Sequence, residues 1–93
     1  IEVPFSVMKI CLESMAVMHQ MAEIGNPNSV TDAAVGALCA RTGVEGAFLN
    51  VRVNCKDFDD AAYVAQIKEK GKQILSEAKK MEAEVLAICD AKL

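Results

Sequence analysis

The stretch from Gly25 to Asn54, GNPNSVTDAAVGALCARTGVEGAFLNVRVN, decides the fold, because a polar turn there leads into a long run of alanine, glycine and valine. The side chain of Asn28 or Ser29 can accept hydrogen bonds from the first free amides of a helix. Asp32 places a carboxylate near the positive end of that helix. The sequence therefore predicts a long helix over residues 29–54.

One side of this helix carries almost no bulk. At about 100° per residue, six positions with small or polar side chains fall within roughly 40° of one line. Together they form a small-residue stripe: Asp32, Gly36, Cys39, Gly43, Gly46 and Asn50. Each glycine inside a helix costs on the order of 1 kcal/mol relative to alanine. We therefore expect another backbone or a ligand to lie against the stripe.

The first segment and the central stretch both indicate helices that need neighbours. Residues 3–24 are amphipathic and rich in methionine, with Pro4 in the first turn and Gly25 as a C-terminal stop. In the central helix, Arg41 and Glu45 are spaced to pair at i, i+4, and apolar residues surround most of the circumference. That pattern is typical of a central helix that packs on several sides.

A third helix is expected over residues 58–92. Asp57 or Asp59 can cap it, with Asp60 in its first turn. Apolar and small residues then recur at spacings of three and four, which favours packing at a shallow angle along another helix. This heptad seam consists of Val64, Ile67, Gly71, Ile74, Ala78, Met81, Val85 and Ile88. The sequence therefore predicts an all-α fold of three long antiparallel helices joined by two short connections.

Size and composition indicate a single small domain that lacks partners. The chain has 93 residues, of which 53% are hydrophobic, and a chain of this size buries only a modest core. The mismatch suggests that another part of a longer protein, a second copy, or both complete the hydrophobic core. A net charge of −3 and the absence of a basic patch give no reason to expect nucleic acid or an anionic membrane as a partner.

The four cysteines, Cys11, Cys39, Cys55 and Cys89, lie too far apart in the sequence for a metal knuckle. Three fall on apolar helical faces, so we expect free buried thiols and a reducing compartment such as the cytosol. The single histidine, His19, has no partners at ligand spacing and is expected at the surface or its boundary, so no metal site is predicted. There is no signal segment and no uncharged run of about 20 residues, which favours a soluble cytoplasmic protein.

The start of the central helix is the strongest candidate for chemistry. Asn26, Asn28 and the free amides that follow them can face an anion or a carbonyl group. Asp32 can act as a general acid or base beside a substrate nitrogen, or it can simply complement the helix dipole. Arg52, at the other end, can hold a carboxylate or pair with an acid on a neighbouring helix. No nucleophile elbow, phosphate loop or dinucleotide fingerprint is present.

The thirty-residue run from Gly25 to Asn54 resembles the signature of the cyclodeaminase domain of formiminotransferase-cyclodeaminase. This family also includes stand-alone cyclodeaminases and methenyltetrahydrofolate cyclohydrolases. The opening IEVPFSVM and the last helix fit the same family, so the resemblance covers essentially residues 1–93. It implies an all-helical, dimer-forming domain about twice this length that acts on a tetrahydrofolate substrate without a metal. The activity implied is ring closure of formiminotetrahydrofolate to methenyltetrahydrofolate with release of ammonia, in histidine degradation and one-carbon metabolism.

Mapped by motif, the resemblance places Asn26, Asn28, Ser29 and Asp32 in the substrate site, with Asp32 as the candidate for proton transfer. Arg52 would bind an anionic group of folate or orient Asp32 from another chain. The resemblance also implies that this chain is the C-terminal half of a larger helical bundle. The N-terminal half, with its glycine-rich segment, is not in the sequence, so we expect the isolated chain to be inactive.

Two other functions remain open from the sequence. A methenyltetrahydrofolate cyclohydrolase shares the scaffold but adds water and releases no ammonia. A non-catalytic helical module would use the heptad seam of residues 64–88 to dimerise.

Overall fold

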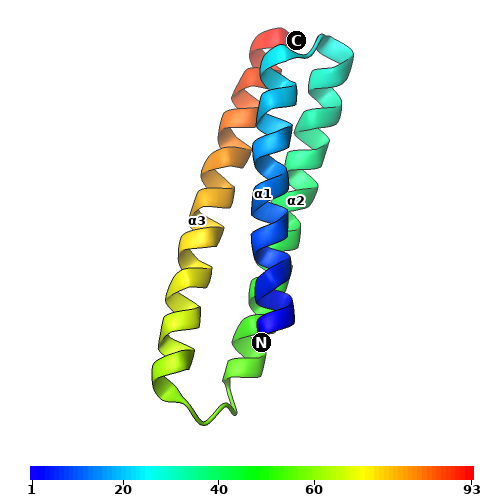
Figure 1. The fold of residues 1–93 in the computed structure, drawn as a ribbon. Coiled ribbons are helices and arrows are strands. Elements are labelled where there is room, and N and C mark those ends of the chain that lie inside the picture. Colours follow the sequence, from blue (N-terminus) through cyan, green and yellow to red (C-terminus); the bar gives the residue numbers. More distant parts are fainter.

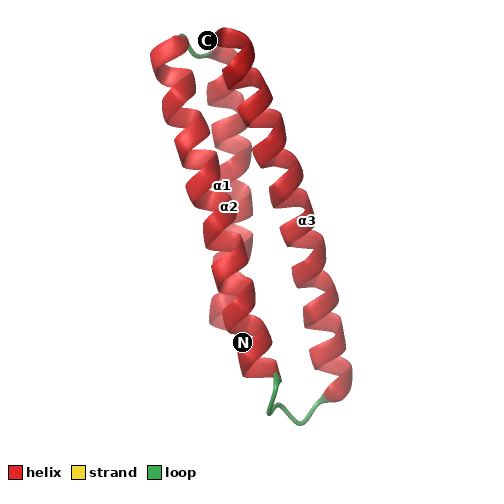
Figure 2. Ribbon diagram, turned by 180° about the vertical axis from the view of Figure 1, so that it is seen from behind, coloured by secondary structure: helices red, strands yellow, loops and turns green.

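The computed structural model describes all 93 residues as a bundle of three α-helices, α1 (Glu2–Ile24), α2 (Pro27–Cys55) and α3 (Ala61–Lys92). In Figure 1, α1 and α3 run in one direction along a rod, and α2 runs in the opposite direction. The rod measures 50 × 16 × 14 Å. Figure 2 shows that the chain leaves helical geometry only at the two connections and the termini, which confirms the all-α prediction. None of the helices is both long and apolar enough to cross a membrane.

Contacts between the helices fix their directions. A Cβ added at Gly36 of α2 would meet Met18 of α1, whereas one added at Gly43 would meet Cys11, so residue numbers rise along α2 as they fall along α1. At the C-terminal end of α3, the Lys92 side chain reaches backbone carbonyls at the C-terminal end of α1. Consecutive helices are therefore antiparallel, and α1 and α3 are parallel.

The connection between α1 and α2 is shorter than predicted. Gly25 ends α1 as expected, and its N–H donates to the carbonyl of Met21 at 2.9 Å. The helix cap of α2 is Asn26, whose side-chain oxygen accepts from the N–H of Ser29 at 3.0 Å. The predicted cap at Asn28 or Ser29 is therefore wrong. The physical reason is Pro27, which lacks an N–H and has its φ fixed near the helical value, so it suits the first helical position.

The cap of α3 is also displaced along the sequence. Asp60 is the N-cap, and its carboxylate accepts from the N–H of Tyr63 at 3.0 Å. The predicted caps Asp57 and Asp59 lie in the connection instead. The ring of Phe58 in this connection packs at 5.4 Å from the Tyr63 ring, measured between centroids. This aromatic contact accompanies a helix that starts at residue 61 rather than at residue 58.

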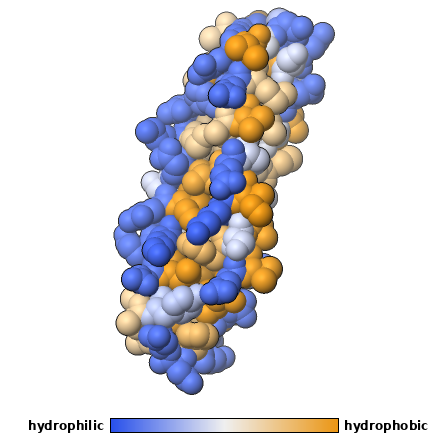
Figure 3. Space-filling model, viewed as in Figure 1, coloured by the Kyte–Doolittle hydropathy of each residue, from blue (hydrophilic) through white to orange (hydrophobic).

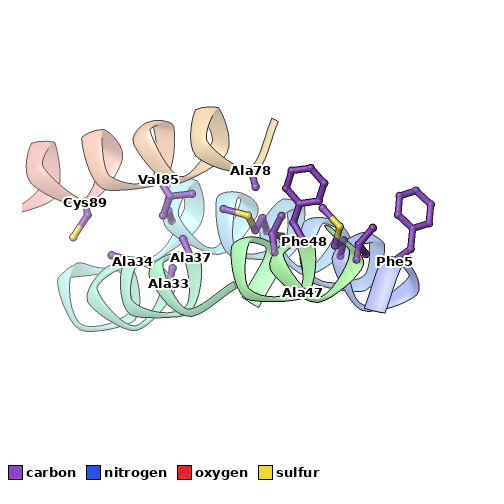
Figure 4. Close-up of a cluster of buried hydrophobic side chains, with 14 of the residues drawn as sticks. Phe5, Ala33, Ala34, Ala37, Ala47, Phe48, Ala78, Val85 and Cys89 are labelled. Atoms are coloured by element: carbon purple, nitrogen blue, oxygen red, sulfur yellow. The ribbon is translucent and has the colours of Figure 1, made fainter. Parts of the chain in front are cut away.

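Seventeen buried hydrophobic residues form one core, and no polar or charged residue is buried. Small side chains of α2 line much of it, and Figure 4 shows Ala37 beside Val85 of α3. Because alanine adds little bulk, these helices approach closely at that end of the rod. Farther along, Phe48 supplies the volume that the alanines do not.

The heptad seam of α3 is confirmed, and it packs within the chain. Ile67, Gly71, Ala78 and Val85 are buried, and the other seam positions are half-buried. A Cβ added at Gly71 would lie 2.8 Å from Cδ1 of Phe48, so the aromatic ring of α2 fills the space above this glycine. The seam is therefore largely occupied by α1 and α2.

Uncovered apolar side chains gather on α1 and α2. Of twelve exposed large hydrophobic residues, ten lie on these two helices and none on α3. In Figure 3 apolar atoms gather over α1 and along the right-hand edge, while the left-hand edge over α3 is hydrophilic. We call these ten residues the outer apolar face: Val3, Val7, Ile10, Val17, Met21, Ile24, Val35, Leu38, Leu49 and Val53.

The small-residue stripe of α2 is covered at two positions only. A Cβ added at Gly36 would lie 2.7 Å from Sδ of Met18, and one added at Gly43 would lie 2.9 Å from Sγ of Cys11. At Gly46 an added Cβ would meet nothing within 4 Å. Helix α1 therefore covers one edge of the stripe, and the expectation of a covering neighbour is wrong for Gly46 within this chain.

Candidate functional site

Hydrogen bonds between neighbouring residues order the first turn of α2. The side-chain oxygen of Asn26 accepts from both the N–H and the hydroxyl of Ser29, at 3.0 and 3.2 Å. The hydroxyl of Thr31 donates to the carbonyl of Asn28 at 2.8 Å. Asn26 and Asn28 are exposed and Ser29 is half-buried. The sequence-predicted residues of this turn therefore lie together, with Asn26 as the cap that orders it.

Few backbone amides remain free at this helix start. Pro27 has no N–H, Ser29 donates to the Asn26 side chain, and Val30 donates to the Asn26 carbonyl at 2.9 Å. The amide of Asn28 is the one donor of the turn that is left for a bound group. This is fewer donors than the sequence suggested, because the cap lies further toward the N-terminus.

Asp32 lies one turn further along α2. It follows Asn28 by four residues and Ser29 by three, so the three side chains share one side of the helix. Asp32 is exposed, and its carboxylate forms none of the ion pairs in the structure. A free carboxylate beside amide and hydroxyl groups can exchange protons with a bound nitrogen compound.

A hollow of about 320 Å³ opens beside this turn. Its walls are Met21, Ile24 and Gly25 from the end of α1 and Asn26 and Ser29 from the start of α2. The hollow thus has an apolar side and a polar side, the combination found in small-molecule sites. It is open to solvent, so it forms only part of a binding pocket.

Arg52 lies far from this turn. It follows Asp32 by twenty positions, which at 1.5 Å per residue separates them by about 30 Å along α2. Its guanidinium carbon lies 5.7 Å from the centre of the Phe48 ring. Lys68 and Lys72 line the same open groove of about 330 Å³. Within one chain, the structure does not bring Arg52 together with the other predicted site residues.

Lys92 makes a contact with the end of α1 that was not predicted from the sequence. Its ammonium group donates to the carbonyls of Ala22 and Glu23, both at 2.6 Å, and to that of Gly25 at 3.1 Å. A positive charge at a helix C-terminus is favoured by the helix dipole. The end of α3 therefore fixes the connection that carries Asn26. No local pattern signals a contact across about seventy residues.

Ion pairs join α3 to the other helices. The predicted pair of Arg41 and Glu45 is confirmed at 2.6 Å, and Arg41 also donates to Glu82 of α3 at 2.9 Å. These hydrogen bonds, first to Glu82 and then to Glu45, raise the pKa of Arg41 above its ordinary value. The guanidinium thus links two helices as a permanent charge.

His19 was expected to lack acidic partners, and the structure corrects this. Its Nδ1 lies 2.9 Å from Glu23 on the same helix, and its Nε2 lies 3.2 Å from Glu84 on α3. The side chain is 26% exposed, so it sits at the boundary as predicted. His19 is therefore a bridge between α1 and α3.

The cysteines are all free, as predicted, but they differ in burial. Cys55 and Cys89 are buried, Cys11 is half-buried and Cys39 is exposed. The expectation of buried thiols is therefore wrong for Cys39 within this chain, because its sector of α2 has no neighbour. No three His, Cys, Asp or Glu side chains gather as metal ligands.

Comparison with known proteins places these observations in a family. The sequence matches the family model described as Formiminotransferase-cyclodeaminase over residues 1–73. It is 36% identical over 77 residues to a methenyltetrahydrofolate cyclohydrolase of Methylorubrum extorquens, covering 83% of this chain and 37% of that protein. It is 33% identical over 92 residues to the formimidoyltransferase-cyclodeaminase of Sus scrofa, covering 99% of this chain and 17% of that protein. The same enzyme of Dictyostelium discoideum is 35% identical over 88 residues, covering 95% of this chain and 16% of that protein.

The chain thus spans little more than a third of the cyclohydrolase and about a sixth of each bifunctional relative. The match to the family model nevertheless includes all of α1 and α2 and the first turns of α3. It also includes the first two turns of α2, which hold Asn26, Ser29 and Asp32. On this match, the chain belongs to the formiminotransferase-cyclodeaminase family.

Proposed function

We propose that this chain is part of a cytoplasmic, folate-dependent cyclodeaminase that converts formiminotetrahydrofolate to methenyltetrahydrofolate and releases ammonia. The observation that carries the proposal is the family match across the first two turns of α2, which hold Asn26, Asn28, Ser29 and Asp32. The name of the relatives from Sus scrofa and Dictyostelium discoideum supports the reaction type. The enzyme would act as an ammonia-lyase in histidine degradation, with tetrahydrofolate as the carrier of the one-carbon group and no metal.

The reaction needs proton transfers at two nitrogens and support for a tetrahedral intermediate. Asp32 is the group that we assign to proton transfer, because its carboxylate is unpaired and points away from the core. The Asn28 amide and the side chains of Asn26 and Ser29 are assigned to substrate binding. Their hydrogen bonds would orient the formimino group beside Asp32.

Arg52 enters this proposal only through an assembly. Its side chain lies about 30 Å along α2 from Asp32, a distance that one rigid helix cannot close. We therefore assign Arg52 to an anionic part of the folate bound mainly by another copy. This assignment requires a homo-oligomer that is at least a dimer.

The pocket is incomplete in this chain. The hollow beside Asn26 is open, and Asp32 is exposed. The remainder of a cyclodeaminase domain would supply the other walls, with or without a fused formiminotransferase domain. The isolated chain is therefore expected to release no ammonia, because a solvent-filled half-site cannot hold the substrate in one geometry.

A methenyltetrahydrofolate cyclohydrolase is the second candidate. It is supported by the relative from Methylorubrum extorquens, which is 36% identical to this chain over 77 residues. The non-catalytic dimerisation module loses its main support, because the heptad seam packs against α1 and α2 within the chain.

The experiment uses a longer protein that carries this sequence within a complete cyclodeaminase domain. Ammonia release from formiminotetrahydrofolate and water addition to methenyltetrahydrofolate are measured in parallel. Asp32→Asn should abolish turnover without a change in thermal stability, whereas the control Asp57→Asn in the exposed α2–α3 connection should keep full activity. Full activity of Asp32→Asn, or turnover by the 93-residue chain alone, would show that the site is assigned wrongly.

A further inference from the structure

Most of the outer apolar face lies on the side of the α1–α2 pair opposite to α3, and Leu38 and Leu49 lie at its flank on α2. On α1, Ile10 is about 160° around the helix from Leu12, which lines the groove with α3. On α2, Val35 is about 140° from Phe48, which contacts Gly71 of α3. Helices α1 and α2 thus form a layer with α3 on one side and nothing on the other.

This face carries one charged side chain, Asp32, which lies near one end on the same helical line as Cys39. The sectors of α1 and α2 that hold its ten apolar residues otherwise contain serine, threonine, asparagine, cysteine and glycine. Exposed α3, by contrast, carries acidic and basic residues along most of its length. A large apolar patch with so little charge is typical of a surface that another protein segment covers.

The area and the shape of the face are those of a stable interface. Helix α2 has 29 residues. At 1.5 Å per residue and with axes about 9 Å apart, the two helices present roughly 800 Å². That area is close to the share of one partner in a standard interface, about 800 Å². At one end, a hollow of about 420 Å³ runs between Val3 and Val7 of α1 and Gly43 and Ala47 of α2. The glycine and alanine leave room there for a bulky apolar side chain.

We propose that the outer apolar face is the docking surface for further helices of the same domain, lying outside these 93 residues, whose uncharged apolar side packs on α1 and α2. The relatives support this occupant, because most of the length of the Methylorubrum extorquens cyclohydrolase lies outside the match. A segment of the same polypeptide also acts at a millimolar effective concentration, which favours it over a second copy. A membrane surface fits poorly, because the net charge is −3 and no basic rim surrounds the face.

Docking on this face bears on the site proposed above. Gly46, which no atom approaches, would receive a helix at close distance. Asp32, at the edge of the face, would pass from open solvent to the wall of an enclosed space. The inference rests on the family and the surface, and its test reads docking directly without any catalytic measurement.

The test uses the reactivity of the native cysteines to measure whether the outer apolar face is covered. The thiol of Cys39 is exposed within the outer apolar face, whereas Cys55 and Cys89 are buried in the core. Alkylation is followed at each cysteine separately by mass spectrometry of the digested protein. Cys39 reports docking, and the two buried thiols report whether the chain stays folded. Ser76→Cys, at an exposed position of α3, supplies a control thiol outside the face.

Two proteins are compared: the 93-residue chain, and the same chain fused to the part of the Methylorubrum extorquens cyclohydrolase outside the match. In the fusion, alkylation of Cys39 should slow at least about tenfold, while the Ser76→Cys thiol keeps its rate. Val35→Asp should restore the Cys39 rate, because it buries an unpaired charge at the interface. Ser76→Asp is the matched control and should leave the protection in place.

Three results would overturn the proposal. In the first, Cys39 reacts equally fast in the fusion while Cys55 and Cys89 stay protected. In the second, Cys39 becomes protected in the separate chain as its concentration rises over about a hundredfold range, which would identify a second copy as the occupant. If the fusion does not fold, the relative's segment is added to the 93-residue chain as a separate polypeptide. The third overturning result is then that sedimentation shows no one-to-one complex and that Cys39 stays reactive.

Discussion

The two glycines Gly46 and Gly71 offer a sharp test of the packing, because the same substitution should have opposite effects at the two positions. Both lie in the interior of long helices. Replacing glycine by alanine there gains about 1 kcal/mol of helix stability. At Gly46 nothing lies within 4 Å of the added Cβ, so Gly46→Ala should stabilise the chain by about that full amount.

At Gly71 the added methyl group would lie 2.8 Å from Cδ1 of Phe48. The ring must shift, and Phe48 is buried in the core beneath Arg52. Forcing extra volume into a packed core costs about 1–3 kcal/mol, which exceeds the gain in helix propensity. Gly71→Ala should therefore destabilise the chain by up to about 2 kcal/mol.

Thermal unfolding followed by circular dichroism measures both variants against the parent chain. One kcal/mol corresponds to a shift of about 4–8 °C in Tm for a domain of this size. We expect Gly46→Ala to melt higher than the parent chain and Gly71→Ala to melt lower. Equal shifts of the same sign would refute the assignment of α3 against Phe48 and of an open sector at Gly46.

Further predictions concern the helix caps and the hydrogen bonds of Lys92 to the end of α1. Asn26→Ala should cost about 1 kcal/mol in urea unfolding, whereas Asn28→Ala should cost almost nothing, because only Asn26 caps α2; similar losses would return the cap to Asn28. Asp60→Ala should likewise destabilise α3 by about 1 kcal/mol in the same assay. Lys92→Met should cost about 1–2 kcal/mol and speed amide exchange at the end of α1, since three carbonyls lose a charged donor. Unchanged exchange at Gly25 after that substitution would mean that Lys92 does not hold the connection.

Features set by local sequence were predictable. The helices, the stop at Gly25, the pair of Arg41 and Glu45 and the seam of α3 all follow from spacings of a few residues. The cap of α2, Asn26, lies two or three positions before the predicted residues Asn28 and Ser29, although the sequence contains Pro27. A proline suits the first helical turn, and the residue before it is then the natural cap. The side chains of Asn28 and Ser29 favour a cap at their own positions, but the backbone constraint at Pro27 dominates.

Contacts across the bundle were beyond local patterns. The bonds of Lys92 to the end of α1 and the bridge of His19 to Glu84 depend on the register between helices that lie far apart in the sequence. The position of Arg52 is a different case, because the single helix predicted over residues 29–54 already places it about 30 Å from Asp32. Residues of one sequence motif, such as Asp32 and Arg52, can therefore lie at opposite ends of a rigid helix.

In the candidate site, some residues hold the first turn of α2 in place and others face open solvent. Mutations can therefore separate structural roles from catalytic roles. Lys92 and the Asn26 cap hold the first turn of α2, so their loss should lower both stability and activity of the complete enzyme. Asp32 makes no ion pair and lies at the edge of the outer apolar face, so its loss should lower activity alone. If Asp32→Asn instead changed stability as much as Asn26→Ala does, the carboxylate would serve the helix dipole, and another group would have to transfer the proton.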